Sequence, residues 1–202
     1  MRYGIIGTGD VAHAIGNKLK ELGHEVMYGS RKGGLTMVGT FAEAAKWSDA
    51  AFCCVRGIHA LEALQSAGAD NLAGKILIDL SNPFQYQDGH ISLDPRWSGH
   101  TSLGEEVQRL LPHTHVVKAL NYLHNHLMTH PDELPEPVTG FYCGNDAEAK
   151  AFVCRLLKDF GWQDTMDLGD ISMSRYTEML GAFWPACYNS LGHMKWGFKL
   201  VR

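Results

Sequence analysis

The chain has 202 residues, of which 45% are hydrophobic and 20% are charged, with 18 lysines and arginines against 22 aspartates and glutamates. These proportions are those of a globular protein and exclude a disordered or fibrous one. A chain of this length forms one domain of ordinary size, or one domain with a small appendage. The formal charge of −4 provides no basic surface for DNA or RNA, so we expect no nucleic-acid partner.

Hydropathy and cysteine usage predict a soluble, cytoplasmic protein. The longest uncharged stretch near the C-terminus, residues 179–194, contains Pro185 and is shorter than the roughly 20 apolar residues that span a bilayer. The N-terminus shows no secretory signal, and we expect no membrane partner. The five cysteines (Cys53, Cys54, Cys143, Cys154 and Cys187) contain no C-x-x-C pair and are expected to be reduced, buried thiols.

Apolar periodicity predicts strands and helices that alternate along the chain. The expected strands are residues 2–6, 25–28, 50–55, 75–80, 115–120, 138–143 and 162–168. The expected helices are residues 11–22, 40–46, 58–67, 102–111, 145–160 and 173–191. Segments 84–100 and 121–137 show no period and are expected to be loops. Strands that are apolar on both faces favour a doubly wound, mostly parallel α/β sheet covered by helices.

Capping signals define several helix ends. Ser102 and Glu105 form a capping-box sequence, and Asn145 with Glu148 is expected to cap the next helix. Gly161 stands where a left-handed residue ends that helix. Pro185, inside the last helix, is expected to kink or split it.

A glycine motif follows the first strand directly. Gly7-x-Gly9-x-x-Ala12 is the dinucleotide-binding pattern of Rossmann folds, in which Gly7 allows a tight turn and Gly9 lets the backbone approach a pyrophosphate. The helix after it presents free N–H groups to the phosphates. Its position between a strand and an amphipathic helix near the N-terminus favours this interpretation over a purely structural turn.

The end of the second strand indicates which dinucleotide binds. An NAD site carries an acid there, but Glu25 lies at the beginning of the strand and the tip is Gly29-Ser30-Arg31-Lys32. A hydroxyl and two cationic groups suit a 2′-phosphate, so we expect NADP(H).

These two motifs resemble a known family. Gly7-Thr8-Gly9 with Gly29-Ser30-Arg31 resembles the NADP-binding domain of the coenzyme F-420-dependent NADP oxidoreductases, and is similar to the cytosolic NADPH domain of six-transmembrane metalloreductases. The resemblance continues through 117–121 (Val-Lys-Ala-Leu-Asn), 144–150, 167–169, Ser174-Arg175 and Glu178. Arg56-Gly57 stands where deazaflavin-using members tend to have Pro-Trp.

The resemblance implies hydride exchange between NADP(H) and a deazaflavin or flavin at the carboxyl edge of the sheet. It implies four groups of cofactor-binding residues besides Gly7: Thr8, Gly9, Asp10 and Val11 at the pyrophosphate; Ser30, Arg31 and Lys32 at the 2′-phosphate; Val55, Arg56 and His59 along the cofactor; Asn82, Pro83, Ala119 and Asn121 at the nicotinamide. Hydride transfer between two rings requires no protein acid or base, so no catalytic residue is assigned.

Other constellations are less specific. His113 and His115 share a face if they lie in a strand and could chelate a metal, but no acid or cysteine completes a set, and we expect no metal site in the histidine-rich stretch 113–130. Trp97 is a candidate for ring stacking, although tryptophans are more often core residues.

We expect residues 1–168 to form the NADP-binding domain and 169–202 a helical extension that completes the pocket. Helix 173–191 is apolar over more than one face, so it either inserts into its own core or packs on a second copy in a homodimer, which the resemblance favours. Two alternative functions remain: an NADPH-dependent reductase of a small imine or ketone, and a non-enzymatic NADPH-binding redox sensor.

Overall fold

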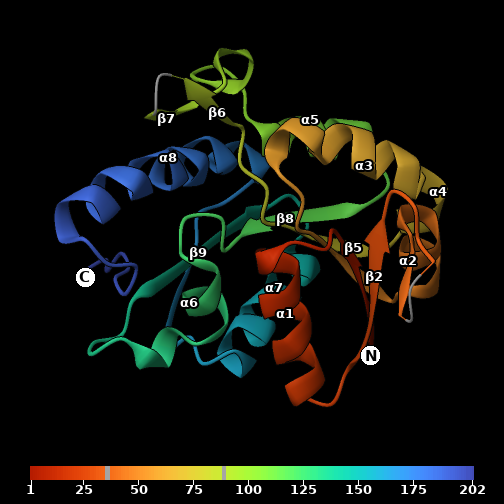
Figure 1. Ribbon diagram of the computed structural model, residues 1–202, viewed down its shortest axis with the longest axis horizontal. Coiled ribbons are helices and arrows are strands. Elements are labelled where there is room, and N and C mark those ends of the chain that lie inside the picture. The colour runs from red at the N-terminus through yellow and green to blue at the C-terminus, as the bar shows by residue number, and fades with distance from the viewer. Residues whose placement is uncertain (35–36, 88–89) are drawn as a thin grey trace.

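A single eight-stranded sheet organises the molecule (Figure 1). The computed structural model describes residues 1–34, 37–87 and 90–202. The strand order is β10-β9-β8-β5-β4-β1-β2-β3, and all neighbours run parallel except β8 and β9. The strands are β1 (Arg2–Ile6), β2 (Glu25–Ser30), β3 (Val38–Thr40), β4 (Ala50–Cys53), β5 (Ile76–Asp79), β8 (His115–Ala119), β9 (Thr139–Gly144) and β10 (Asp164–Asp167). The predicted α/β fold with a doubly wound, mostly parallel sheet is therefore confirmed.

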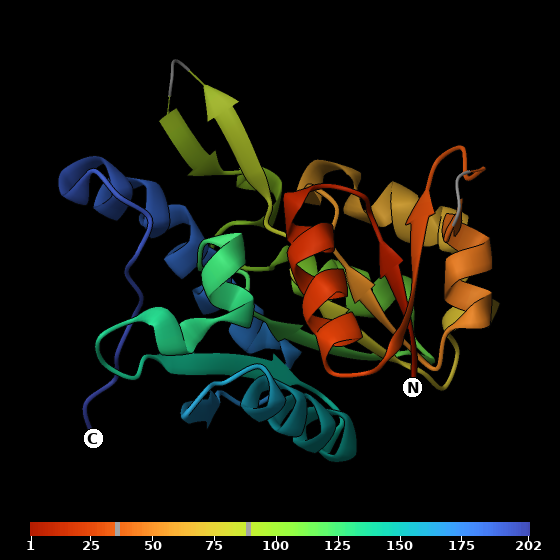
Figure 2. The same ribbon diagram turned by 60° about the horizontal axis from the view of Figure 1, so that its bottom comes forward.

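Helices cover both faces of this sheet, because neighbouring strand residues point to opposite sides. Ile5 belongs to one buried core cluster and Ile6 to the other. The first cluster includes residues of α1, α6 and α7, and the second includes residues of α2, α3 and α5. Figure 2 shows α1 and α7 on the near side of the sheet. The helices are α1 (Asp10–Glu21), α2 (Phe41–Trp47), α3 (Ala60–Ala67), α4 (Ala69–Leu72), α5 (Leu103–Leu110), α6 (Asn125–Thr129), α7 (Ala147–Asp159) and α8 (Ser174–Leu191).

The expected loops contain regular structure that the sequence analysis missed. In segment 84–100, β6 (Phe84–Gln87) and β7 (His90–Leu93) form an antiparallel hairpin, of which residues 88–89 lie outside the described residues. Phe84 and Tyr86 alternate with glutamines, and Ile91 and Leu93 alternate with His90 and Ser92, but each alternation covers only four residues and was overlooked. Segment 121–137 contains the short helix α6, and β3 adds an edge strand beyond β2.

Two of the predicted caps are confirmed and one is displaced. The Ser102 hydroxyl accepts a hydrogen bond from the Glu105 N–H, and Gly161 follows α7 with φ +104°. The cap of α7 is Asp146, whose carboxylate accepts from the Ala149 N–H, so the prediction of Asn145 was wrong by one residue. Asn145 instead accepts from the Ile171 N–H and fixes the approach to α8.

Helix α8 has an inverted polarity. Its buried residues are polar or small (Ser174, Thr177, Glu178 and Gly181), whereas Tyr176, Met179 and Phe183 are about half exposed. Of the two alternatives for this helix, insertion into its own core therefore does not hold for these three side chains. The helix also continues past Pro185 to Leu191 without being split. Trp184 stacks on Tyr188, one turn later, across the position of the proline.

The last residues form a strap rather than a helix. After Gly192 the chain leaves α8 and passes beside β9, where the Thr139 N–H donates to the Phe198 carbonyl. Ion pairs from Lys199 to Glu136 and from Arg202 to Asp164 hold the strap. The expected helical extension is thus one helix followed by irregular chain.

Candidate nucleotide and acceptor site

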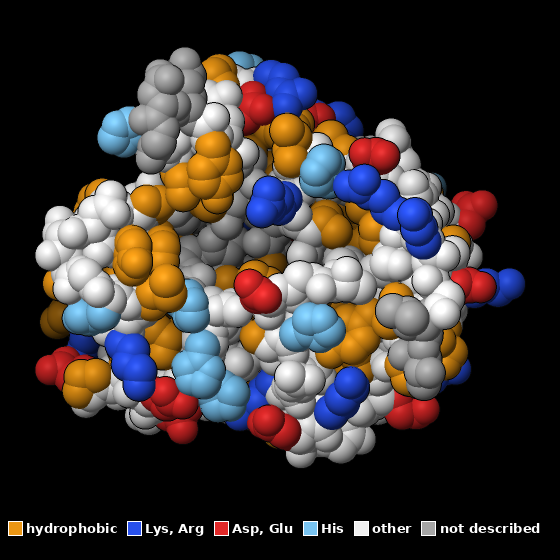
Figure 3. Space-filling view, in the orientation of Figure 1, with side chains coloured by type: hydrophobic (Ala, Val, Ile, Leu, Met, Phe, Trp, Pro, Cys, Tyr) orange, Lys and Arg blue, Asp and Glu red, His pale blue; other side chains and the backbone are white. Residues whose placement is uncertain are grey.

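A continuous groove follows the carboxyl edge of the sheet. Three adjoining clefts compose it: an outer cleft of about 580 Å³, a middle cleft of about 780 Å³ and an inner cleft of about 510 Å³. Gly9 lines the outer and middle clefts, and Asn82 lines the middle and inner clefts. Figure 3 shows the surface hollowed above the N-terminal end of α1. The groove lies where the strand order reverses beside β1, the usual ligand site of such sheets.

The glycine turn has the geometry that a phosphate cradle requires. Gly7 has φ +133°, and a Cβ there would meet the Cys54 carbonyl at 2.9 Å, so no other residue fits without strain. A Cβ on Gly9 would meet no atom within 4 Å, because this residue faces the open groove. Gly9 is also the N-cap of α1, and within the described chain no side chain caps that helix. Its first N–H groups are thus available to an anion.

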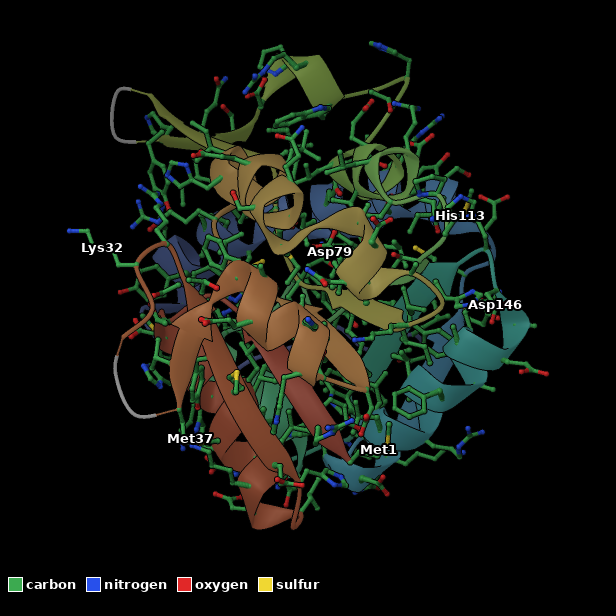
Figure 4. All side chains as sticks on the ribbon, turned by 90° about the vertical axis from the view of Figure 1, so that its right-hand side faces the viewer. Met1, Lys32, Met37, Asp79, His113 and Asp146 are labelled. Carbon is green, nitrogen blue, oxygen red and sulfur yellow. The ribbon has the colours of Figure 1, made fainter. Side chains whose placement is uncertain are left out.

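The outer cleft carries a cation and hydroxyls at its far end. Ser30, Arg31 and Thr40 line it. The Ser30 hydroxyl accepts from the Gly33 N–H and shapes the turn, and Arg31 is exposed, with no ion pair among residues 1–34, 37–87 and 90–202. Lys32 does not line the cleft; Figure 4 shows its side chain projecting away from the molecule.

The loop after β4 forms one wall of the groove. Val55, Arg56 and His59 line both the outer and the middle cleft. Gly57 packs so tightly on the Asn82 carbonyl that any side chain there would clash, which explains a glycine beside Arg56. The Cys54 thiol lies beside them, and burial raises its pKa, so it stays protonated.

Two asparagines close the inner end. Asn82 Nδ2 donates to the Asn121 carbonyl at 2.5 Å, and Asn121 Nδ2 donates to Asn82 Oδ1 at 2.9 Å. Leu120, between β8 and Asn121, is buried with φ +62°, a conformation that turns the chain into the cleft. Gly181 of α8 packs on this pair, since a Cβ there would lie 2.9 Å from Asn82 Oδ1. We call these two residues the asparagine clasp.

A buried ionic cluster lies directly behind the clasp. Lys118 Nζ contacts Asp79 Oδ2 at 2.8 Å, Glu178 Oε1 at 3.0 Å and the Ser81 carbonyl at 2.5 Å. All three charged side chains are at most 1% exposed. Burial opposes the charge of Lys118, but attraction to the two carboxylates outweighs it and raises the pKa of Lys118 above its ordinary value.

Glu178 joins this cluster to the beginning of α5. Its carboxylate accepts hydrogen bonds from the N–H groups of Leu103 and Gly104, the first residues of that helix. Burial raises the pKa of Glu178, against the opposing influence of Lys118 and these two N–H groups. Figure 4 shows Asp79 in the interior, between the helices of the two faces.

Most residues expected around the cofactor lie in the groove. The outer cleft contains Gly7, Thr8, Gly9, Ser30, Arg31, Val55, Arg56 and His59, and the other two clefts contain Asp10, Val11, Asn82 and, in the inner one, Asn121. Pro83 and Ala119 are buried, and neither they nor Lys32 line any of the three clefts. Their predicted contacts with a cofactor stay predictions.

Several residues of the groove were not singled out by sequence. Phe84, Tyr86, His124 and Trp184 line the inner cleft, whereas Trp97 lies under the Arg96 guanidinium and lines none of the three clefts. Two signals in the sequence point to the ionic cluster: Asp79 and Lys118 lie in mostly apolar strands, and the family resemblance includes Lys118 and Glu178. Burial lowers the pKa of His124, with a smaller contribution from His126, so it is neutral near pH 7.

The histidine-rich stretch does not converge on one point. His115 faces Asp146, and His126 pairs with Glu133 and stacks on His130. No group of three potential metal ligands occurs among the described residues. Within residues 1–34, 37–87 and 90–202, no helix is both long and apolar enough to cross a membrane.

Comparison with known proteins identifies the family. The family described as NADP oxidoreductase, coenzyme F420-dependent, matches residues 2–83. A crystal structure from Arthrobacter sp. FB24, described as a candidate F420-dependent NADP reductase, is 37% identical over the whole of both chains, with a TM-score of 0.94. The chain belongs to the F420-dependent NADP oxidoreductase family. The members of this family are NADP-dependent oxidoreductases.

Two further similarities extend this comparison. The rat metalloreductase STEAP3 is 30% identical over 188 residues, which are 89% of this chain but 36% of the rat protein, so the chain spans about a third of that relative. Plasmodium falciparum pyrroline carboxylate reductase, solved with NADP bound, shares 13% identity and a TM-score of 0.61 over 95% of this chain and 66% of that one. The second likeness shows the shared fold alone.

The open space at Gly9 generates a test of the phosphate cradle. Gly9→Ala should fold with a loss of at most about 1 kcal/mol, because its Cβ meets no protein atom and only the N-cap preference is affected. Affinity for NADPH should nevertheless fall more than tenfold, since the methyl group occupies the approach of the pyrophosphate. Urea unfolding and calorimetric titration measure the two effects. A variant of normal stability and normal affinity would contradict the assignment.

Proposed function

We propose that the protein binds NADP(H) along the outer and middle clefts and exchanges a hydride with a flavin or deazaflavin ring in the inner cleft. The observation that carries the proposal is the continuity of the groove from Arg31, past the open Gly9, to the asparagine clasp and Trp184. Such a groove would accommodate a dinucleotide with a second ring beyond its nicotinamide end.

The cofactor's parts have matching partners in this arrangement. Gly7 to Val11 and the N-terminus of α1 would receive the pyrophosphate. Ser30 and Arg31 would bind the 2′-phosphate by charge-assisted hydrogen bonds, with Lys32 contributing at longer range. Arg56 and His59 would border the middle of the cofactor, and Asn82 and Asn121 the nicotinamide.

In this reaction the C4–H bond of dihydronicotinamide breaks with its electron pair, a bond forms at flavin N5 or deazaflavin C5, and solvent supplies the proton that completes the reduced ring. The protein's part is to hold two rings in contact and exclude water. The asparagine clasp would help to hold the rings in place, and the aromatic side chains of Phe84 and Trp184 would help to exclude water. Neutral His124 is a poor acid near pH 7, which favours an acceptor that requires no protein acid.

A reductase of a small imine or ketone is the second candidate. Asp10 and His124 line the inner cleft and are the groups that could deliver a proton there. The fold is shared with an imine reductase from Streptomyces aurantiacus, at 17% identity and a TM-score of 0.63, but this chain covers 64% of that protein. A redox sensor would bind NADPH in the same groove without turnover.

We also propose that residues 169–202 complete the pocket and form a homodimer interface. Gly181, Trp184 and Pro185 of α8 line the inner cleft. Tyr176, Met179 and Phe183 lie at helical spacing on the opposite, exposed side of α8. The side of α8 that faces its own chain is the polar side, which belongs to the ionic cluster. The apolar side therefore stays exposed in one chain, and a two-fold contact with a second copy would cover it.

The preference for NADPH over NADH tests the 2′-phosphate site. Losing one or two charge-assisted bonds should weaken NADH by roughly 2–4 kcal/mol relative to NADPH. Arg31→Ala should remove most of this difference, whereas the matched Lys32→Ala variant should reduce it only slightly, because Lys32 points away from the cleft and acts at longer range. Calorimetric titration of both nucleotides measures the gap. Equal affinities in the unaltered protein would contradict an NADP site.

The acceptor distinguishes the candidate functions. Stopped-flow oxidation of NADPH should proceed with F420 or FMN and be absent with simple ketones and cyclic imines. Its rate should not depend on one essential acid between about pH 6 and 8. Turnover of a cyclic imine with such a dependence would favour the imine reductase, and tight NADPH binding without any turnover would favour the sensor.

Oligomeric state tests the role of the exposed side of α8. Light scattering at micromolar concentration should report about twice the chain mass of 22.4 kDa. Phe183→Glu should give monomers, because the charge would be buried in the proposed interface, while Glu148→Lys on α7 serves as an exposed control. A monomer at all concentrations would contradict the interface.

A further inference from the structure

One buried polar atom of the groove has no partner. Asn121 is 3% exposed, and its Oδ1 accepts no hydrogen bond from the described residues. A buried acceptor left in this state costs about 1–3 kcal/mol, so it usually has a reason.

The orientation of this amide is fixed by the clasp. Asn82 must point its Nδ2 toward the Asn121 backbone carbonyl, because two oxygens would repel each other there. Asn82 Oδ1 then accepts from Asn121 Nδ2, which leaves Asn121 Oδ1 free. Exchanging the oxygen and nitrogen of either side chain would place two like groups together, so Oδ1 is committed as an acceptor.

The same cleft contains a donor without a partner. Trp184 lines it, and its Nε1 is buried and donates to none of the described residues. The ring is held by parallel packing on Tyr188 and Trp196, at centroid distances of 5.4 and 5.8 Å. Asn121 and Trp184 both line the inner cleft, and a ligand edge that carries an N–H next to a carbonyl would complement their acceptor and donor.

We propose that the inner cleft selects ring ligands by such an amide or imide edge, with the ligand N–H donating to Asn121 Oδ1 and its carbonyl accepting from Trp184 Nε1. This inference rests on the proposed placement of ring ligands in the groove. Two ligands carry an N–H next to a carbonyl. One is nicotinamide, through its carboxamide, and the other is a flavin or deazaflavin ring, through its imide edge.

Ligand analogues separate the two sources in the unaltered protein. The 3-acetylpyridine analogue of NADP⁺ keeps the carbonyl but lacks the amide N–H, and N3-methyl-FMN lacks the imide N–H. If the carboxamide is the source, the first analogue should bind about tenfold more weakly than NADP⁺; if the imide is the source, the second should bind about tenfold more weakly than FMN. Calorimetry of the four ligands measures both ratios.

Matched variants test the protein side. Asn121→Leu should abolish whichever discrimination is observed, because it removes the acceptor. Trp184→Phe keeps an aromatic wall but removes the N–H, and should weaken the discriminated ligand about tenfold. Trp196→Phe is the control, since it removes an equally unpartnered N–H from a ring outside the cleft lining but keeps an aromatic ring to pack on Trp184.

The outcomes distinguish this inference from the function on which it rests. If NADP⁺ and FMN bind but both analogues bind as tightly as their parents, or if Trp196→Phe weakens binding as much as Trp184→Phe, the inference is overturned and the proposed function stands. If neither NADP⁺ nor FMN binds, the proposed function fails and the inference fails with it.

Discussion

The contact of Lys118 with Asp79 and Glu178 is the constraint on which the rest of the site depends. Asp79 and Lys118 are register partners on β5 and β8, so their ion pair joins the two strands that precede Asn82 and Asn121. Glu178 extends the cluster to α8 and to the beginning of α5. Removing one partner of such a buried cluster typically costs about 3–5 kcal/mol, because the remaining charge has lost its compensation.

This cluster explains the inverted helix. A helix normally buries its apolar side, but α8 must present Glu178 to a buried lysine and Gly181 to the asparagine clasp. Among its larger apolar side chains, Trp184 therefore lines the inner cleft and Phe183 is exposed to solvent, while Leu180 packs against the first core cluster. The electrostatic requirement of the interior thus produces both the aromatic wall of the groove and the exposed stripe that we assign to a second copy.

The two ends of the groove differ in how firmly they are held. At the outer end Arg31 is exposed on a turn, which suits a side chain that folds over a phosphate when it binds. At the inner end the clasp and the ionic cluster fix the backbone after β5 and β8, and the terminal strap places Trp196 behind Trp184. This division suits a protein that orients two rings for hydride transfer, since a rate by that route depends on geometry more than on acid–base groups.

The sequence by itself determined the strand–turn–helix unit at Gly7 and Gly9, the alternation of strands and helices, and the basic tip at Arg31, because each depends on neighbours along the chain. The tertiary structure decided what depends on distant partners. Lys118 meets Asp79 across 39 residues, and Glu178 meets Leu103 across 75. Local periodicity does not report contacts between residues so far apart in the chain. The hydrogen bonds of the clasp, the inverted polarity of α8 and the position of Trp184 could therefore not be predicted. The hairpin β6–β7 was missed for a different reason, since its apolar alternation covers only four residues in each strand.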